Sequence, residues 1–474
     1  MYFPVTSPSA TGQLVGAVTS TTSSSTCSSP TDQLVEFRAG SYDCLTSWGD
    51  ALFELADAVL CTPGRVSSVP ALSLDPAFRR SHGSLYKGLQ KGEVDPGQAR
   101  ELLVRSRPNW PLVYAVDASA WPRCDAETSP GRGFYHSASR HSAGQPIVAG
   151  WDYQWVPQVN FEPDSWTAPL DVTRIPPDAD ATRATVDQVR QVVATLPQDA
   201  TVPMFVFDAG YDPAGLTYGL EGTRAQVLVR LRGDRVFYAE PPGQPRRSGR
   251  AGRPRRHGHR FKLSDPSTAP RTDAEASLED RRYGKVRVRA WYNLHPCLPK
   301  RGPWAGDGRP PIVRGDIIRI DVERLPKPSS RANNKTLWLW WSGPGEPDLE
   351  LCLNAYLHRF DLEHTYRFVK NTLGWTTPSL RTPEQADRWT WLVLGTYNQL
   401  RLARGIIEDV RLPWEKPRDP AKLTPGRARR GFPGLRAIIG TPANPPKSQR
   451  PGPGRPKGTC RPPRTRYPVI KKAA

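Results

Sequence analysis

The sequence predicts a mixed α/β protein whose α/β domain is interrupted by a mainly β insertion. Short apolar runs alternate with an amphipathic helical pattern between residues 109 and 235, which is typical of strands mixed with helices. β-like runs fill residues 236–345, and helical patterns resume in residues 346–410. We therefore expect the α/β domain in two parts, at 109–235 and 346–410.

Composition and charge narrow the choice of partner. The chain has 474 residues and a formal net charge of +20, with a pI of about 9.9. Such a charge favours a polyanionic partner, with nucleic acid ahead of a membrane surface. No apolar run approaches the roughly 20 residues that span a bilayer. We therefore expect no membrane partner.

The start of the chain and the cysteines bear on compartment. Residues 1–30 are rich in Ser and Thr, and the first positive side chain is Arg38. This start lacks the charged and apolar parts of a signal peptide, and we expect a disordered tail. The seven cysteines are scattered, odd in number and never spaced as C-x2-C. They argue against a disulfide framework or a zinc site and favour a reducing cytoplasm.

Helical patterns dominate residues 31–108. "SWGDALFELADAVL" is one, and "SLYKGLQKGEVDPGQARELLVRS" contains two helical stretches separated by a turn at Asp95, Pro96 and Gly97. This segment fits a small DNA-binding module, and it fits a plain helical hairpin equally well.

Two apolar runs in residues 109–235 lead into aspartates. "PLVYAVDAS" closes on Asp117 and "VPMFVFDAGY" closes on Asp208. "GQPIVAGWDYQWV" alternates as a strand does, "ATVDQVRQVVATL" has the helical period, and "AQVLVRLRG" is a further strand. Each aspartate alone fits a turn or a helix cap.

The insertion at 236–345 contains "KVRVRAWYNL", "DIIRIDVERL" and "KTLWLWWSG", which are β-like, and a basic loop at 244–262. After it, "YLHRFDLEHTYRFVK" (356–370) predicts one helix, with Pro347 and Asp348 as its start and Gly374 as its stop. A last helix is expected to begin at Thr382 and Pro383.

One face of the helix at 356–370 carries an unusual set of groups. At about 100° per residue, Tyr356, Arg359, Glu363 and Lys370 fall within an arc of about 60°. A solvated stripe with weak ion pairs would explain this pattern. A shared functional face would explain it as well.

The end of the chain is strongly basic. Residues 411–474 contain 17 Lys and Arg against Glu415 and Asp419, together with 14 prolines. Such a composition predicts a disordered tail. "PGPGRPKG" in this tail and "AGRPRR" at 251–256 resemble AT-hooks, although any Arg- and Pro-rich coil produces such matches by chance.

Asp117, Asp208 and Glu363 together suggest a sharper hypothesis. Three carboxylates that converge can hold two divalent cations, one activating the attacking water or 3′-OH and the other stabilising the leaving oxygen. Mg²⁺ prefers oxygen ligands, so carboxylates without Cys or His suit it. A basic protein with this triad would cut or join DNA.

The order Asp, Asp, Glu resembles that of the DDE transposases of bacterial insertion sequences. "FDAGY" surrounds the second Asp, and Tyr356-x2-Arg359-x3-Glu363-x6-Lys370 fills the Tyr-Arg-Glu-Lys signature of one group in that family. The resemblance covers about residues 110–405. It implies an RNase H-like catalytic fold, with Asp117 on the first strand, Asp208 at the end of the fourth, and a β-rich insertion before the helix of Glu363.

The resemblance also implies roles for these residues. Asp117, Asp208 and Glu363 would be the catalytic residues and the ligands of two Mg²⁺ ions, for which Mn²⁺ can substitute. Tyr356, Arg359 and Lys370 would bind the phosphates of the transposon end.

The implied function is that of a DNA transposase, which binds terminal inverted repeats, cleaves the strands and joins the 3′ ends to target DNA. We expect double-stranded DNA as its partner, a homodimer on that DNA, and a location beside the nucleoid in the bacterial cytoplasm. Two alternatives stay open: an RNase H-like nuclease that cuts without joining, and a non-catalytic DNA-binding protein derived from a transposase.

Several other side chains have two possible roles. The family implies an aromatic side chain in the insertion that stacks on a flipped base, and strand tryptophans are more often core residues. The candidates are Trp291, Trp338, Trp340 and Trp341. Four further acids near the triad fit surface or cap positions, namely Asp125, Asp152, Asp212 and Asp361.

Overall fold

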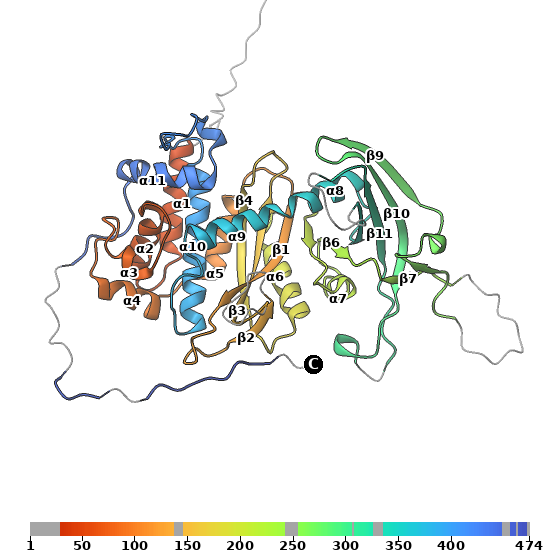
Figure 1. Ribbon diagram of the computed structural model, residues 1–474, viewed down its shortest axis with the longest axis horizontal. Coiled ribbons are helices and arrows are strands. Elements are labelled where there is room, and N and C mark those ends of the chain that lie inside the picture. Colours follow the sequence, from red (N-terminus) through yellow and green to blue (C-terminus); the bar gives the residue numbers. More distant parts are fainter. Residues whose placement is uncertain are drawn as a thin grey trace, which may run out of the picture.

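The computed structural model shows a mixed α/β protein with one large mixed sheet and helices packed around it (Figure 1). It describes residues 29–136, 146–241, 255–305, 308–325, 335–447, 456–460 and 463–471. The expected N-terminal tail, apart from its last two residues, lies outside this part of the chain. So do residues 244–254 of the basic loop, which include most of the AT-hook-like stretch at 251–256, and residues 451–455 of the stretch "PGPGRPKG".

Five strands form the part of the sheet that carries the two aspartates. β1 (Val113–Pro122), β5 (Met204–Phe207) and β6 (Gln226–Leu231) are parallel neighbours. β3 (Ile147–Val159) is antiparallel to β1, and β4 (Thr167–Ile175) is antiparallel to β3. This arrangement is consistent with an RNase H-like domain.

The strand predictions were right in kind and incomplete in number. β2 (Gly133–His136) and β4 were not predicted. Asp208 follows β5, which is the fourth of the five catalytic strands in chain order and the fifth when the short β2 is counted. The sequence of β4 does not look like a buried strand because it contains Asp171. This aspartate is buried nevertheless, since it pairs with Arg100 at 2.8 Å. β1 also continues past Asp117, although we expected it to close there.

The strands of residues 236–342 extend the same sheet. β12 (Thr336–Ser342) pairs with β6, and β11 (Gly315–Val322) and β10 (Gly284–Pro296) follow in order. The remaining strands are β7 (Val236–Tyr238), β8 (Arg260–Lys262) and β9 (Ala274–Asp280), with short 3-10 turns at Pro266–Thr268 and Gly302–Trp304.

Helices pack on both faces of the catalytic strands. α6 (Ala181–Thr195) and α7 (Pro213–Gly219) pack together, and Gln188 of α6 donates to the main-chain carbonyl of Gln154 on β3. On the other face, the Trp155 ring of β3 meets that of Trp375 at 5.0 Å. The catalytic strands therefore form the middle layer.

The N-terminal helices form a separate group that packs on the long helix α10 (Pro383–Ala403) (Figure 1). As predicted, Thr382 caps α10. The turn expected at Asp95, Pro96 and Gly97 is instead the start of the next helix, with Asp95 as its cap and the other two residues in its first turn. The group consists of α1 (Pro30–Asp43), α2 (Gly49–Cys61), α3 (Val69–Leu72), α4 (His82–Lys91) and α5 (Pro96–Arg105). In the described residues no helix is long and apolar enough to cross a membrane.

The single helix predicted around residues 356–370 is wrong. The structure has α8 (Leu349–His358), capped by Asp348 as expected, and α9 (Asp361–Asn371). Between them the N–H groups of Leu362 and Glu363 bond three residues back rather than four. The tighter turn shifts the angular register, so the shared face calculated for a continuous helix does not exist.

The expectation of a disordered tail is wrong for part of residues 411–474. A 3-10 turn at Pro420–Lys422 leads into α11 (Pro425–Ile439), which packs on α2 and α10. The basic composition gave the wrong prediction here because Arg427 and Arg429 are not solvated. Both are buried and form hydrogen bonds with partners inside the protein.

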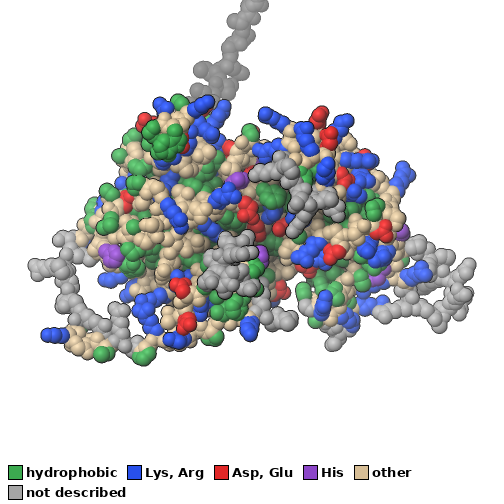
Figure 2. Space-filling model, viewed as in Figure 1, with side chains coloured by type: hydrophobic (Ala, Val, Ile, Leu, Met, Phe, Trp, Pro, Cys, Tyr) green, Lys and Arg blue, Asp and Glu red, His purple; other side chains and the backbone are tan. Residues whose placement is uncertain are grey.

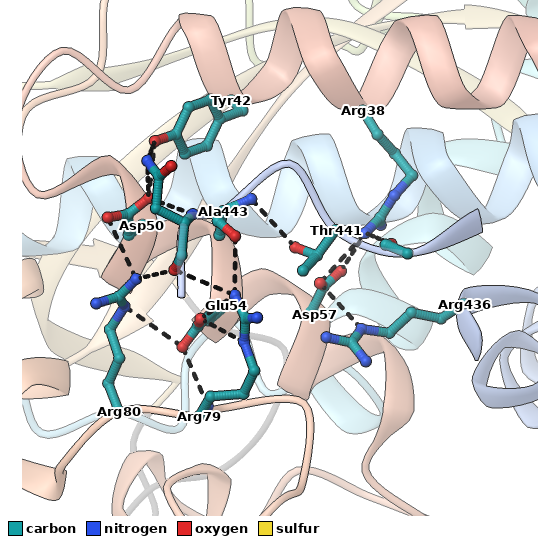
Figure 3. A network of polar contacts seen from close by, with 12 residues as sticks. Arg38, Tyr42, Asp50, Glu54, Asp57, Arg79, Arg80, Arg436, Thr441 and Ala443 are labelled. Carbon is teal, nitrogen blue, oxygen red and sulfur yellow. Dashed lines mark hydrogen bonds and ion pairs between the residues drawn. The ribbon is translucent and has the colours of Figure 1, made fainter. Parts of the chain in front are cut away.

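A buried polar network anchors α11 and the residues after it (Figure 3). Asp57 of α2 is fully buried and pairs with Arg38 of α1 at 2.8 Å and with Arg436 of α11 at 3.0 Å. Glu54, one turn earlier, holds Arg79, whose guanidinium also donates to the carbonyl of Ala443. Two acids of α2 therefore join the N-terminal helices to the C-terminal segment.

Replacement of Asp57 by Ala should destabilise the protein by about 3–5 kcal/mol, because the buried Arg38 and the partly buried Arg436 would both lose their counter-charge. Chemical denaturation measures this loss. Glu275→Ala is the control: it breaks an exposed pair with Arg287 and should cost less than about 1 kcal/mol. Equal effects of the two substitutions would contradict the network's importance.

Candidate active site

Strand register alone brings the two predicted aspartates together. In the parallel pairing of β1 with β5, Val116 lies opposite Phe207, so the next residues, Asp117 and Asp208, are neighbours. Phe207 likewise lies opposite Val229 of β6, which sets Arg230 beside Asp208. Asp117, Asp208 and Arg230 therefore form one row across three parallel strands.

Arg359 joins the two carboxylates. Its guanidinium lies 3.4 Å from Asp117 Oδ2 and 3.6 Å from Asp208 Oδ1. Arg230 reaches the same Asp208 oxygen at 3.6 Å. Arg359 is only 4 % exposed, whereas Arg230 is 45 % exposed. The inner, bridging position between the aspartates thus belongs to Arg359.

The break between α8 and α9 places Arg359 there. Arg359 is the residue after α8, and its guanidinium stands over the rings of Tyr356 at 5.8 Å and Phe360 at 5.2 Å. Tyr356 is buried and Phe360 is about half exposed. Two aromatic rings therefore help to hold the cation in place.

Helix α9 carries the remaining signature residues, Glu363 and Lys370, and packs against β1, to which Tyr366 also bonds. The hydroxyl of Tyr366 donates to the carbonyl of Asp117 at 2.7 Å, and Lys370 Nζ donates to Ser119 Oγ at 2.7 Å. Glu363 lies on the exposed side of this helix. Figure 2 shows acidic side chains gathered near the middle of this face, with Lys and Arg around them.

Burial sets the electrostatics of the site. It raises the pKa of Asp117 to about 6, against the opposing effect of Arg359 and with help from Glu363 and Asp208. Burial alone would lower the pKa of Arg359, but Asp208 and Asp117 raise it. Burial also lowers the pKa of Lys370, with Glu363 opposing. The negative charges of the carboxylates lie close together here, and the positive charge of Arg359 compensates them.

These residues suit a divalent cation in chemistry but not in their present arrangement. The donors are carboxylate oxygens, and Asp208 Oδ1 is buried without a hydrogen bond, as a hard cation would require. Yet in the part of the chain that the structure describes, no group of three or more His, Cys, Asp or Glu could hold a metal ion. Arg359 stands between the first two expected ligands.

Comparison with known proteins identifies the family. A family model described as "DDE superfamily endonuclease" matches residues 41–296, more than half of the chain. The chain belongs to this family. Membership indicates a transposase-type nuclease with metal-dependent activity. No curated protein matches the chain.

The matched range of the DDE superfamily endonuclease model covers only part of the candidate site. Asp117 and Asp208 lie inside residues 41–296. The whole Tyr-Arg-Glu-Lys signature lies beyond it, so the roles of its residues are argued from their geometry.

The structure also places the secondary candidates. The four tryptophans proposed for base stacking are at most 8 % exposed, so they are core residues as the alternative held. Asp212 caps α7, Asp361 bonds His358, and Asp125 is exposed. The sequence analysis missed Arg230. It could have been found as the one basic residue within the apolar run of β6, where it is the one exposed position.

Asp117 should make stability depend on pH. Its pKa is raised from 3.8 to about 6, so the folded state favours the neutral form. The contribution is fully present below about pH 4 and is lost as pH rises through 6. Asp117→Asn, which stays neutral, should therefore be more stable than the wild type at pH 7.5 by about 2 kcal/mol, after allowance for partial exposure.

Urea unfolding of both proteins at pH 4 and pH 7.5 measures this difference. Taking the difference between variant and wild type cancels the other titrating groups. A difference that does not grow between the two pH values would contradict the burial of this carboxyl.

Proposed function

We propose that this DDE superfamily endonuclease is the DNA transposase of an insertion sequence. It binds terminal inverted repeats, cleaves the DNA at the element's ends and joins the 3′ ends to target DNA. The observation that carries the proposal is the placement of Asp117 beside Asp208 on adjacent parallel strands, with Arg359 at the α8–α9 break bridging them and Lys370 of α9 bonding β1.

The chain's own residues divide the work as follows. Asp117, Asp208 and Glu363 would hold two Mg²⁺ ions, which activate the attacking oxygen and stabilise the leaving one when bound. Lys370 is half-buried and bonds Ser119, two residues along β1 from Asp117. From there its ammonium group contacts a backbone phosphate and fixes the DNA without reading its sequence.

Tyr356 and Arg359 are not free to contact a phosphate in the DNA-free protein. Both are buried, and Arg359 is engaged with the two aspartates. In the DNA-free protein they shape the site, and a phosphate contact by Arg359 requires its side chain to move.

The charge of the protein supports DNA as the partner. The net charge of +20 supplies phosphate contacts that are independent of sequence, and affinity for DNA should fall steeply with salt. We propose a homodimer on the DNA, because two ends must be held for joining.

Glu363→Gln should lower Mg²⁺-dependent cleavage of a labelled duplex that carries the element's own end by at least about a hundredfold, because a metal-ligand charge worth several kcal/mol is lost. EDTA should abolish cleavage by the wild type. The matched control is Glu350→Gln on α8, an exposed acid outside the row, which should keep full activity.

The products discriminate between the candidate functions. Insertion of the cleaved end into a target plasmid supports a transposase, and nicks without insertion support a nuclease. Wild-type protein that binds the end and never cuts it would contradict the catalytic proposal and favour a DNA-binding protein.

A further inference from the structure

We propose that Arg359 occupies the cation position between Asp117 and Asp208 in the DNA-free protein and keeps divalent metal out until a DNA phosphate draws its guanidinium away. The inference rests on the proposed function, since it concerns when that site accepts its metal. It assigns to Arg359 an autoinhibitory contact in addition to any contact with DNA.

The first support is position. One guanidinium reaches an oxygen of each aspartate, at 3.4 and 3.6 Å. A divalent cation shared by the same oxygens would lie about 2.1 Å from each. The cation and the guanidinium would then be in contact with like charge, at a site where Arg359 is buried and the aspartates are partly buried, and their repulsion disfavours joint occupancy. Only one of them can hold the position.

The second support is the quality of the contact. Charge-assisted hydrogen bonds between N–H and carboxylate are shortest and strongest at about 2.7–2.9 Å, and both distances here are longer. Asp208 Oδ1 and Arg359 Nε are buried without hydrogen bonds. Such under-satisfied groups lose little when the pairing is exchanged for a better one.

The third support is the location of Arg359 in the chain. It follows the last residue of α8, where the bonding pattern changes before α9 begins. On its outer side lies Phe360, which is 48 % exposed. A rotation of the side chain past this ring would carry the guanidinium toward solvent, where a phosphate could receive it in a bidentate contact.

Metal and DNA binding would then be coupled. A phosphate that engages Arg359 frees both carboxylates for the metal, and a bound metal frees Arg359 for the phosphate. By linkage each ligand tightens the other by the same factor. The site would bind its metal only when DNA is bound, and metal-dependent chemistry would therefore not occur in the DNA-free protein.

The test measures Mn²⁺ binding to the DNA-free full chain by calorimetry. Arg359→Met should bind Mn²⁺ at least about tenfold more tightly than the wild type, because the competent state is no longer masked. Arg230→Met is the matched control, since it removes an equal charge from Asp208 without vacating the position between the aspartates. It should tighten binding less than about threefold, by the general loss of repulsion.

Removal of Arg359 also takes away the guanidinium that Asp117 and Asp208 share and leaves Asp208 with Arg230 alone, so a second measurement uses unaltered protein. Mn²⁺ binding by the wild type should tighten when a DNA duplex is bound, and Arg359→Met should show no such gain. Arg359→Lys keeps the positive charge but lacks the planar guanidinium that reaches both carboxylates. Its gain in Mn²⁺ affinity on DNA binding should lie between those of the wild type and Arg359→Met.

The outcomes separate the two proposals. A Mn²⁺ site that Arg359→Met strengthens no more than Arg230→Met does, or that DNA leaves unchanged in the wild type, would overturn the inference alone. Absence of Mn²⁺ binding by every variant, with and without DNA, would overturn the proposed function and the inference with it.

Discussion

The parallel pairing of β1 with β5 is the constraint on which the candidate site depends. Because Val116 lies opposite Phe207, Asp117 and Asp208 must be adjacent and point to the same face. A slip of one residue would send one carboxylate to the opposite face of the sheet. The apolar residues before each aspartate are fully or almost fully buried on both faces of the sheet, so the packing of the core on either side holds this register and with it the geometry of the site.

That same register creates an electrostatic problem that the protein solves with arginine. Two carboxylates side by side at the edge of a core repel each other and lose hydration. Arg359 compensates them from the helix side and Arg230 compensates Asp208 from β6. The compensation is incomplete, as the raised pKa of Asp117 and the unbonded Asp208 oxygen indicate. Residual strain of this kind is typical of sites that await a ligand.

Sequence reasoning found what short-range patterns encode. Asp117 and Asp208 stood out because apolar runs led into them, and the caps at Asp348 and Thr382 were recognised from their side chains. The break at Arg359 could not be found this way, because its cause is long-range: the residue pairs with strands some 150 and 240 positions earlier. Likewise, α11 is stable through Asp57 and other distant partners, which composition does not reveal.

The position of α9 depends in turn on the N-terminal helices. Tyr366, which bonds the Asp117 carbonyl, stacks on Trp375. Trp375 is held through both its indole N–H and its carbonyl by α10, and α10 receives Arg38 of α1 through Gln399. The buried network around Asp57 is therefore continuous with the active-site face through α10. The N-terminal helices are consequently connected, through this one helix, to the strands that carry the aspartates. This continuity accounts for buried ion pairs far from the site, because they fix the helix from which the site is positioned.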